Sequence, residues 1–295
     1  MQVHMHDVYE KTGKVNQNMA KHIVGHKHHV ALLPNLFLLN QHIKSRSDLS
    51  IIEEADAGLY FSFIGGQAIQ SIDDIDSVQI SYLPRKLQGE LEFTKGEQVG
   101  LLQMKISSAH LATTLGENED QIIQHFRMMK EKLGNDNGII ELPFTEKLAS
   151  LCEPVLTHTG HSISLAGHIY AVIFNLIEQL QMLSHLSQCE DCQSKLFNAQ
   201  NRIEMLNYEV LDIKQLSQQV GLNPEALEIG FNLIVGQPIR SYWTLTRVKS
   251  AAVRLRENPT NKGSILAQSG LSEEQFEAAF LQHFGVSSHH YGQIH

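Results

Sequence analysis

Three side chains that can bind metal follow one another at helical spacing in the middle of the chain: His185, Cys189 and Cys192. On a helix, positions i, i+4 and i+7 lie on one side, so one imidazole and two thiols could bind a single metal ion. The two cysteines form a CxxC motif, which could equally be a redox pair. A CxxC without a second pair is also compatible with reduced structural thiols, so the sequence leaves all three interpretations open.

A second group of potential ligands is the histidine-rich stretch at residues 21–30, KHIVGHKHHV. Histidine-rich tracts can bind zinc, nickel or iron. His26 and His28 would point to the same side of a strand, and His110 and Glu97 are candidates for further ligands. These residues would suit a metal-binding, cupin-type protein. The alternative is a solvated edge strand.

Motifs for other chemistry are missing from the sequence. It contains no GxxxxGK[ST] phosphate loop, no GxGxxG and no GxSxG. Cys152 has no evident catalytic partner. We therefore expect a protein that is not an enzyme and needs no cofactor.

Composition indicates a two-domain globular chain. Its 295 residues suffice for two cores, and 42% hydrophobic with 19% charged residues is ordinary for such proteins. No apolar run approaches the roughly 20 residues of a membrane span. The polar start lacks the apolar core of a signal peptide, and three cysteines are too few for a disulfide framework. We expect a cytoplasmic protein with no membrane partner.

The last third of the chain predicts two helix-turn-helix units, at 211–231 and 264–286, joined by an amphipathic helix at 238–255. Gly221 suits a tight turn, while Asn223 and Pro224 suit the start of the next helix. Such units place helices in DNA grooves.

These stretches resemble the AraC/XylS family of bacterial transcription regulators over about residues 193–291. The matching residues are the turn 220–223 with Leu227 and Phe231, then Tyr242, Arg247, Ala251, Gly270-Leu271-Ser272, Phe276, Phe280, 284–287 and Tyr291. The segment VGLNPEALEIGF is similar to the corresponding segment of the siderophore-responsive branch, which includes the pyochelin regulator.

The resemblance implies a transcription regulator that binds double-stranded DNA, works as a homodimer and responds to a small effector, an iron chelate for that branch. The side chains that we expect at the DNA lie on the second helix of each unit and on the joining helix: Glu225, Glu228, Asn232, Arg240, Lys249, Arg254, Arg256, Glu274 and Gln275. From the periodicity we also expect Ala226 and Ile229 to face outward.

Charge argues against simple DNA binding. The net charge is −9, and the residues from 193 onward hold nine Lys/Arg and nine Asp/Glu, whereas DNA affinity depends on cations that neutralise phosphates. Arg240, Lys249, Arg254 and Arg256 would have to form a continuous positive stripe. The alternative is a degenerate regulator that acts through protein partners.

Compared with the family, the second unit also looks one residue short between Ser272 and Phe276. A missing residue would rotate the rest of the helix by about 100° relative to the turn.

The front half alternates apolar and polar residues between turn signals, at 30–33, 36–39, 59–64, 80–83, 87–93 and 99–106. This pattern predicts half-buried strands in a small barrel or sandwich, and the resemblance implies a cupin-like, effector-sensing domain. Four large side chains could line its pocket or simply form its core: Phe61, Phe63, Tyr82 and Met104.

Helical periodicity begins near residue 108, with a long helix at 162–186. In it, apolar residues recur at spacings of four and three: Ile169, Ile173, Leu176, Leu180 and Leu183. They form either a core face or a dimer seam. The predicted fold is therefore α+β: a β-barrel or cupin-like domain at 1–160, a helix and linker at 161–192, and an all-α double helix-turn-helix domain at 193–295.

Overall fold

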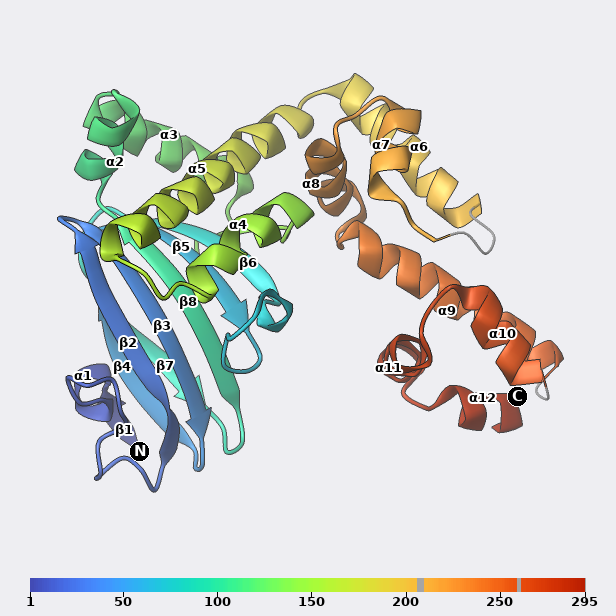
Figure 1. Cartoon of the computed structure of the whole chain (residues 1–295), viewed down its shortest axis with the longest axis horizontal. Coiled ribbons are helices and arrows are strands. Elements are labelled where there is room, and N and C mark those ends of the chain that lie inside the picture. Colours follow the sequence, from blue (N-terminus) through green and yellow to red (C-terminus); the bar gives the residue numbers. More distant parts are fainter. Residues whose placement is uncertain (206–209, 259–260, 295) are drawn as a thin grey trace. The chain divides into compact units, whose positions relative to one another are not determined.

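The computed structural model describes residues 1–205, 210–258 and 261–294. It is a mixed α+β structure (Figure 1). Contacts divide the chain into two compact units, Met1–Ser184 and His185–His295. Strands occur in the first unit, and the described residues of the second form helices and the turns between them.

Six strands of the first unit form one antiparallel sheet in the order β2-β3-β8-β5-β6-β9. Their bounds are β2 (Ile23–Leu33), β3 (Leu36–Ser45), β5 (Gly58–Gly65), β6 (Ser77–Leu83), β8 (Gln98–Ile106) and β9 (Ile140–Leu142). Pro34 and Asn35 join β2 to β3, and the positive φ of Asn35, 64°, suits the second central position of a tight turn. The histidine-rich β2 is an edge strand, as expected.

A smaller sheet has the order β1 (Gln2–His4), β4 (Leu49–Ala55), β7 (Leu87–Phe93). Among residues 1–184, all of which are described, the strand pairings leave two sheets and form no closed ring. The large sheet ends at β9, which has three residues and pairs with β6. A separate apolar cluster packs between the short helix α1 (Met5–Val8), β4 and the ends of β2 and β3; it includes Val8, Ile23, Ile43 and Ile51.

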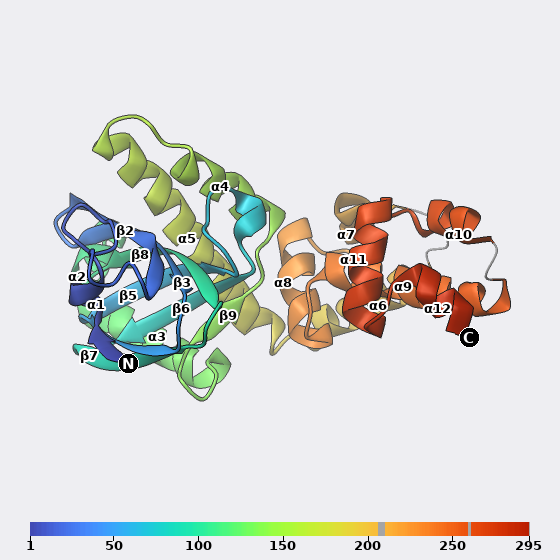
Figure 2. The same cartoon turned by 90° about the horizontal axis from the view of Figure 1, so that it is seen from below.

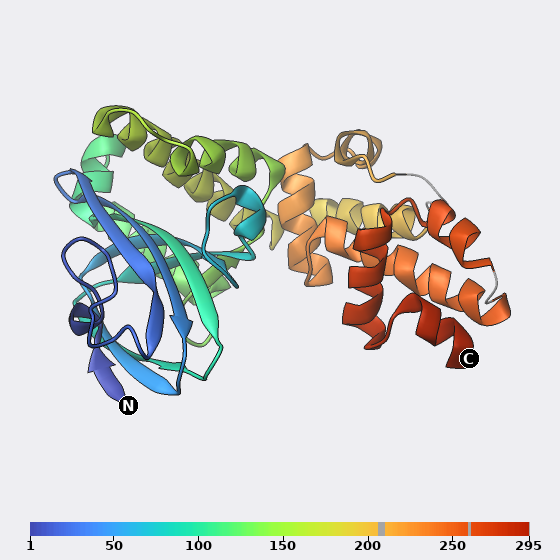
Figure 3. The same ribbon diagram turned by 60° about the horizontal axis from the view of Figure 1, so that its bottom comes forward.

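The remaining helices of the first unit are α2 (Ser108–Leu115), α3 (Glu119–Leu133), α4 (Glu146–Leu156) and α5 (Ser162–Leu186). Figures 1 and 3 show them gathered on one side of the strands, with α1 on the other. Phe63 in β5 packs edge-on against Phe144, next to the start of α4, with ring centres 6.2 Å apart. This side of the large sheet is therefore the main core of the unit.

The apolar face of α5 belongs to that core. All five residues of the predicted seam are buried within this one chain: Ile169, Ile173, Leu176, Leu180 and Leu183. Gln179, also fully buried, donates to Thr145 and Asn175. The dimer-seam interpretation of these residues is therefore wrong, because their own chain already covers them. By length and composition α5 could cross a membrane, and the five residues of this face are buried within the chain.

The second unit contains α6 (Glu190–Met205), α7 (Ile213–Val220), α8 (Pro224–Val235), α9 (Ile239–Glu257), α10 (Lys262–Ser269), α11 (Glu273–Phe284) and α12 (Ser288–Ile294). Figure 2 shows α9 leading from α8 to the cluster of α10, α11 and α12.

Candidate functional site

The second unit repeats one local design twice. An eight-residue helix, α7 or α10, ends at a left-handed glycine, Gly221 or Gly270. Two residues later a polar side chain, Asn223 or Ser272, caps a twelve-residue helix, α8 or α11. Each of these longer helices again ends at a left-handed glycine. Gly221 and Gly270 adopt φ of 73°, a conformation that side chains with a Cβ rarely take.

Equivalent apolar residues hold both copies together. Phe231 in α8 packs edge-on against Tyr242, with ring centres 5.4 Å apart. At the same relative positions, Phe280 in α11 packs against Tyr291 at 5.2 Å. The two copies correspond residue by residue, and α11 has the same length as α8. The one-residue shortening between Ser272 and Phe276, which was inferred relative to the family, stays a prediction.

On α8 the predicted contact residues are only partly available. Glu225, Glu228 and Asn232 are half-buried, and Asn232 lies in the last turn of the helix. Ala226 and Ile229, which we expected to face outward, are buried. That expectation is wrong because α8 packs closely on α6: a Cβ at Gly230 would lie 2.6 Å from Leu196.

The acidic residues of α11 differ in their roles. Glu274 is exposed in the first turn, and Gln275 accepts a hydrogen bond from the Ser272 amide at 3.3 Å, which completes a capping box. Glu277 is held by Lys262 at 2.8 Å and by the Ser288 amide at 3.1 Å. Burial raises the pKa of Glu277, but its bonds to Lys262 and Ser288 outweigh this and hold that pKa below its usual value. Glu277 is therefore a structural tie between α10, α11 and α12.

The cations of α9 do not form one stripe. At about 100° per residue, Arg254 lies near the side of Arg240, whereas Lys249 and Arg256 lie on the opposite side. Arg254 and Arg256 are bonded to neighbouring helices. Arg254 donates to Gln268 in α10, and Arg256 donates to the hydroxyl of Tyr291 while stacking on its ring. Arg240 and Lys249 are exposed.

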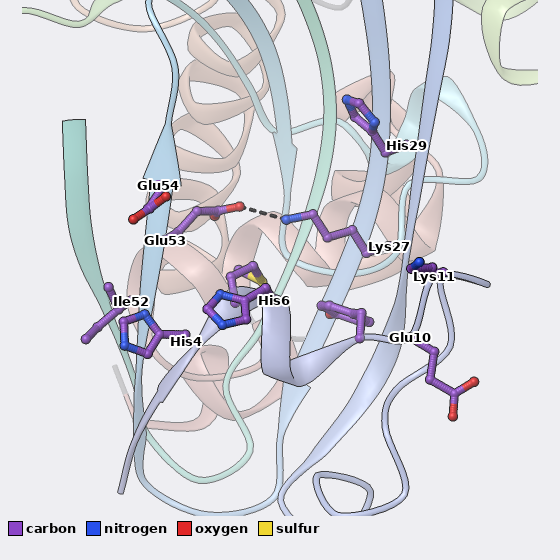
Figure 4. Close-up of a pocket in the computed structure, with 11 residues that line it drawn as sticks. His4, His6, Glu10, Lys11, Lys27, His29, Ile52, Glu53 and Glu54 are labelled. Atoms are coloured by element: carbon purple, nitrogen blue, oxygen red, sulfur yellow. Dashed lines mark hydrogen bonds and ion pairs between the residues drawn. The ribbon is translucent and has the colours of Figure 1, made fainter. Parts of the chain in front are cut away.

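The first unit contains two adjoining hollows, of about 540 and 300 Å³, that share Lys27, His29, Glu53 and Glu54. Figure 4 shows the larger one, with His4 and His6 on one side of it. Lys27 and Glu53 point toward one another and form an ion pair at 2.8 Å. The smaller hollow adds residues of four strands of the large sheet, among them Tyr60, Gln103 and Lys105.

Charges and apolar rings meet in the smaller hollow. The Lys105 ammonium lies 5.6 Å from the ring centres of both Phe37 and Tyr60 and pairs with Asp56 at 3.2 Å. Burial raises the pKa of Tyr60 to about 12. Burial, followed by the charges of Lys27 and Lys105, lowers the pKa of His29. The hollow therefore offers an imidazole and a phenol beside two lysines, Lys27 and Lys105, each of which already forms an ion pair with a carboxylate.

Of the two interpretations left open for the four large side chains of this domain, the core is the one that the structure shows. Phe61, Phe63, Tyr82 and Met104 are buried in the core on the helix-covered side. Their neighbours of opposite parity, such as Tyr60, Ser81 and Lys105, line the hollow instead. The signal that could have found them is the polar set that alternates with the large apolar residues.

The four histidine and glutamate residues considered for a metal in the front half are not brought together. His26 and His28 have ring centres 5.1 Å apart on β2. His110 is hydrogen bonded to Tyr170 in α5, and Glu97 accepts from the amide of Thr94 at 2.9 Å. These separate engagements leave no common ligand set.

His185, Cys189 and Cys192, by contrast, do come together. Their ligand atoms all lie within 4.8 Å of one another, and they are the one such group of three among the described residues. Nε2 of His185 lies 3.8 Å from Sγ of Cys192. The two thiols are half-buried, and the imidazole is exposed.

No protein-family model matches the chain, and no curated protein matches it. Among solved structures, it is similar to the C-terminal domain of AraT, a response regulator from Geobacillus stearothermophilus. They are 19% identical with a TM-score of 0.32, over 34% of this chain and 85% of that one.

An AraC-type transcriptional regulator from Chromobacterium violaceum is 22% identical with a TM-score of 0.32, over 34% of this chain and 91% of that one. ToxT from Vibrio cholerae is 10% identical with a TM-score of 0.29, over 84% of this chain and 98% of that one. TM-scores this low assign neither a fold nor a function to this chain.

Proposed function

We propose that the chain is a ligand-responsive, DNA-binding transcription regulator of the AraC type, and that α7–α8 and α10–α11 are its two helix-turn-helix units. The observation that carries this proposal is the repeated design of helix, left-handed glycine, capping residue and longer helix. A short helix followed by a fixed turn and a second helix is the arrangement that presents the second helix to the major groove.

The first turns of α8 and α11 would then meet base edges, because recognition helices enter the groove with their N-terminal residues. Glu225 and Glu274 lie in these turns. A carboxylate can accept from the amino group of cytosine, so these residues would favour a narrow set of sequences. Lys249, exposed on α9, would contribute through phosphates.

The effector would bind in the hollows of the first unit. Their volumes are near the range of about 300–1,000 Å³ that is usual for small-molecule sites. Lys27 and Lys105 would bind an anionic group that displaces their present partners, Glu53 and Asp56. The rings of Phe37 and Tyr60 would contact an apolar body. An acidic iron chelate, which the sequence resemblance implies, has this character. This unit would bind its ligand without chemical conversion.

Fluorescence anisotropy with labelled genomic fragments tests the DNA-binding proposal, with a scrambled duplex as reference, at about 50 and 200 mM salt. Lys249→Ala should weaken binding to all sequences and lower the salt dependence by about one unit of slope. Lys44→Ala, at an exposed position in the first unit, is the matched control. Arg254 and Arg256 are poor choices for substitution because they bond α10 and α12. Failure to bind any fragment even at low salt would overturn the proposal.

A second candidate function is regulation through a protein partner. It is favoured by the separation of the α9 cations onto two sides and by exposed Glu273 and Glu274 at the start of α11. Like charges there would repel phosphates and attract a basic protein surface instead. If no DNA fragment binds at low salt, this candidate replaces the first.

A further inference from the structure

We infer that His185, Cys189 and Cys192 form a binding site for one thiophilic metal ion, with Zn²⁺ as the best match, and that the metal joins the last turn of α5 to the first turn of α6. This inference does not depend on the proposed function. One imidazole and two thiolates are a ligand set that Zn²⁺ uses when a water or another ligand fills its fourth position.

The distances fit such an ion. With Zn–S near 2.3 Å and Zn–N near 2.0 Å, tetrahedral geometry separates two sulfurs by about 3.8 Å and a sulfur from a nitrogen by about 3.6 Å. Cys192 Sγ and His185 Nε2 are 3.8 Å apart, and the widest separation in the group is within 4.8 Å. Side-chain adjustments of about 1 Å would complete the coordination.

The backbone that carries the ligands is already ordered by other bonds. The Cys189 amide donates to the His185 carbonyl at 3.1 Å, and the Gln193 amide donates to the Cys189 carbonyl at 3.0 Å. The Gln193 side chain also donates to the carbonyl of Ser187, in the turn, at 3.1 Å. The site is therefore preformed, and little conformational entropy opposes binding.

The start of α6 also holds the Cys189 sulfur in place. Cys189 directly precedes α6, and its sulfur accepts a hydrogen bond from the Cys192 amide at 3.2 Å. Lys195, one turn further along α6, adds a positive charge that it shares with Asp191 at 2.6 Å.

The site lies next to the two leucines on which α8 packs. Leu186 and Leu196, both buried, are the residues that a Cβ at Gly230 in α8 would meet, at 3.2 and 2.6 Å. Leu186 is next to the ligand His185 in sequence, and Leu196 is one helical turn beyond Cys192. Bound metal would thus fix the turn on which α8 rests.

Cobalt and zinc titrations of the full chain, reduced and freed of metal by a chelator, test this inference. Co²⁺ should produce thiolate-to-metal charge-transfer absorption that saturates at one equivalent, and Zn²⁺ should displace it. Zn²⁺ should also protect Cys189 and Cys192 from alkylation, as mapped by peptide mass spectrometry, whereas buried Cys152 serves as the internal reference.

Three variants complete the test. The double variant Cys189→Ser, Cys192→Ser should lose the charge-transfer absorption; serine at 189 keeps a helix-capping oxygen, so folding should be preserved. His185→Asn should weaken Zn²⁺ binding by about 10-fold or more. His283→Asn, at another exposed histidine of the second unit, should change nothing. The inference is overturned if the absorption never appears, if it survives in the double variant, or if the reduced thiols remain open to alkylation in excess Zn²⁺.

Discussion

At the scale of single residues, acidic side chains in the second unit have different effects. In the sequence, Glu277 is an acidic residue that would repel DNA phosphates. In the structure, its carboxylate joins three helices through Lys262 and Ser288. Its charge is compensated within the protein. Glu273 and Glu274, by contrast, project from the start of α11 as exposed acids. The electrostatic objection to DNA binding is therefore smaller than the sequence suggested.

Glu277→Gln should lower the free energy of unfolding of the second unit by about 1 kcal/mol at pH 7, because an ion pair and a helix cap are weakened. The folded-state pKa of Glu277 is depressed, so its contribution is complete above the unfolded pKa of about 4.3. It is lost as the pH falls through the folded pKa. Denaturant unfolding of variant and parent at pH 7 and at lower pH measures this.

The matched control is Glu274→Gln, an exposed acid in the same helix, which should change stability by less than about 0.5 kcal/mol. A difference between parent and Glu277→Gln that stays constant as the pH falls would contradict the assigned role of the carboxylate.

At the scale of elements, the apolar face of α5 decides between core and dimer. Its seam residues are buried without a second copy of the chain, and Gln179 within the same face finds partners in Thr145 and Asn175. A helix whose apolar face is already covered has little left to offer a partner there. Any dimer of this chain would need another surface.

Leu176→Ala should destabilise the first unit by about 2–5 kcal/mol, the usual range for a buried leucine. The difference between the unfolding midpoints of variant and parent should not depend on protein concentration, since this core is complete without a second copy. Unfolding at two concentrations that differ by about 100-fold checks this. A difference that changes with concentration would show that copies of the chain associate through this face.

Local patterns in the sequence predicted the positions of strands and helices better than the residues that line the surface hollows. The alternation around Phe61 and Phe63 located β5, and the period of α5 located its buried stripe, because both patterns record burial. Neither pattern records what covers a face, so the polar residues that line the hollow were not identified from the sequence. The His185, Cys189 and Cys192 group was found because its geometry is contained in one short segment.

Other errors had physical causes that the sequence only partly contains. Arg240 and Lys249 are nine residues apart in α9, a spacing that by itself puts them on opposite sides of a helix. The burial of Ala226 and Ile229 depends on the close packing of α8 on α6, a tertiary contact that no local pattern reveals.

At the scale of the molecule, the chain has separate cores in its two units. The first is built on the large sheet and α5, and the second includes the cluster of α9–α12 around Phe276 and Phe280. Separate cores need not unfold together. The unit that we propose binds the ligand and the unit that we propose binds DNA therefore each have their own hydrophobic core.

Calorimetry of the full chain should accordingly show departure from a single two-state transition. Leu176→Ala should shift only the component of the first unit, and Glu277→Gln only that of the second. Equal shifts of one undivided transition in both variants would mean that the two units melt as one body.

Gly230 has a consequence for natural variation. Its missing side chain leaves room for Leu186 and Leu196 to touch the α8 backbone. An exchange to a residue larger than alanine would be tolerated only together with a smaller residue at one of those positions. Positions 186, 196 and 230 should therefore covary among related sequences. Such covariation would show, from genome sequences alone, that α8 packs on these two leucine positions.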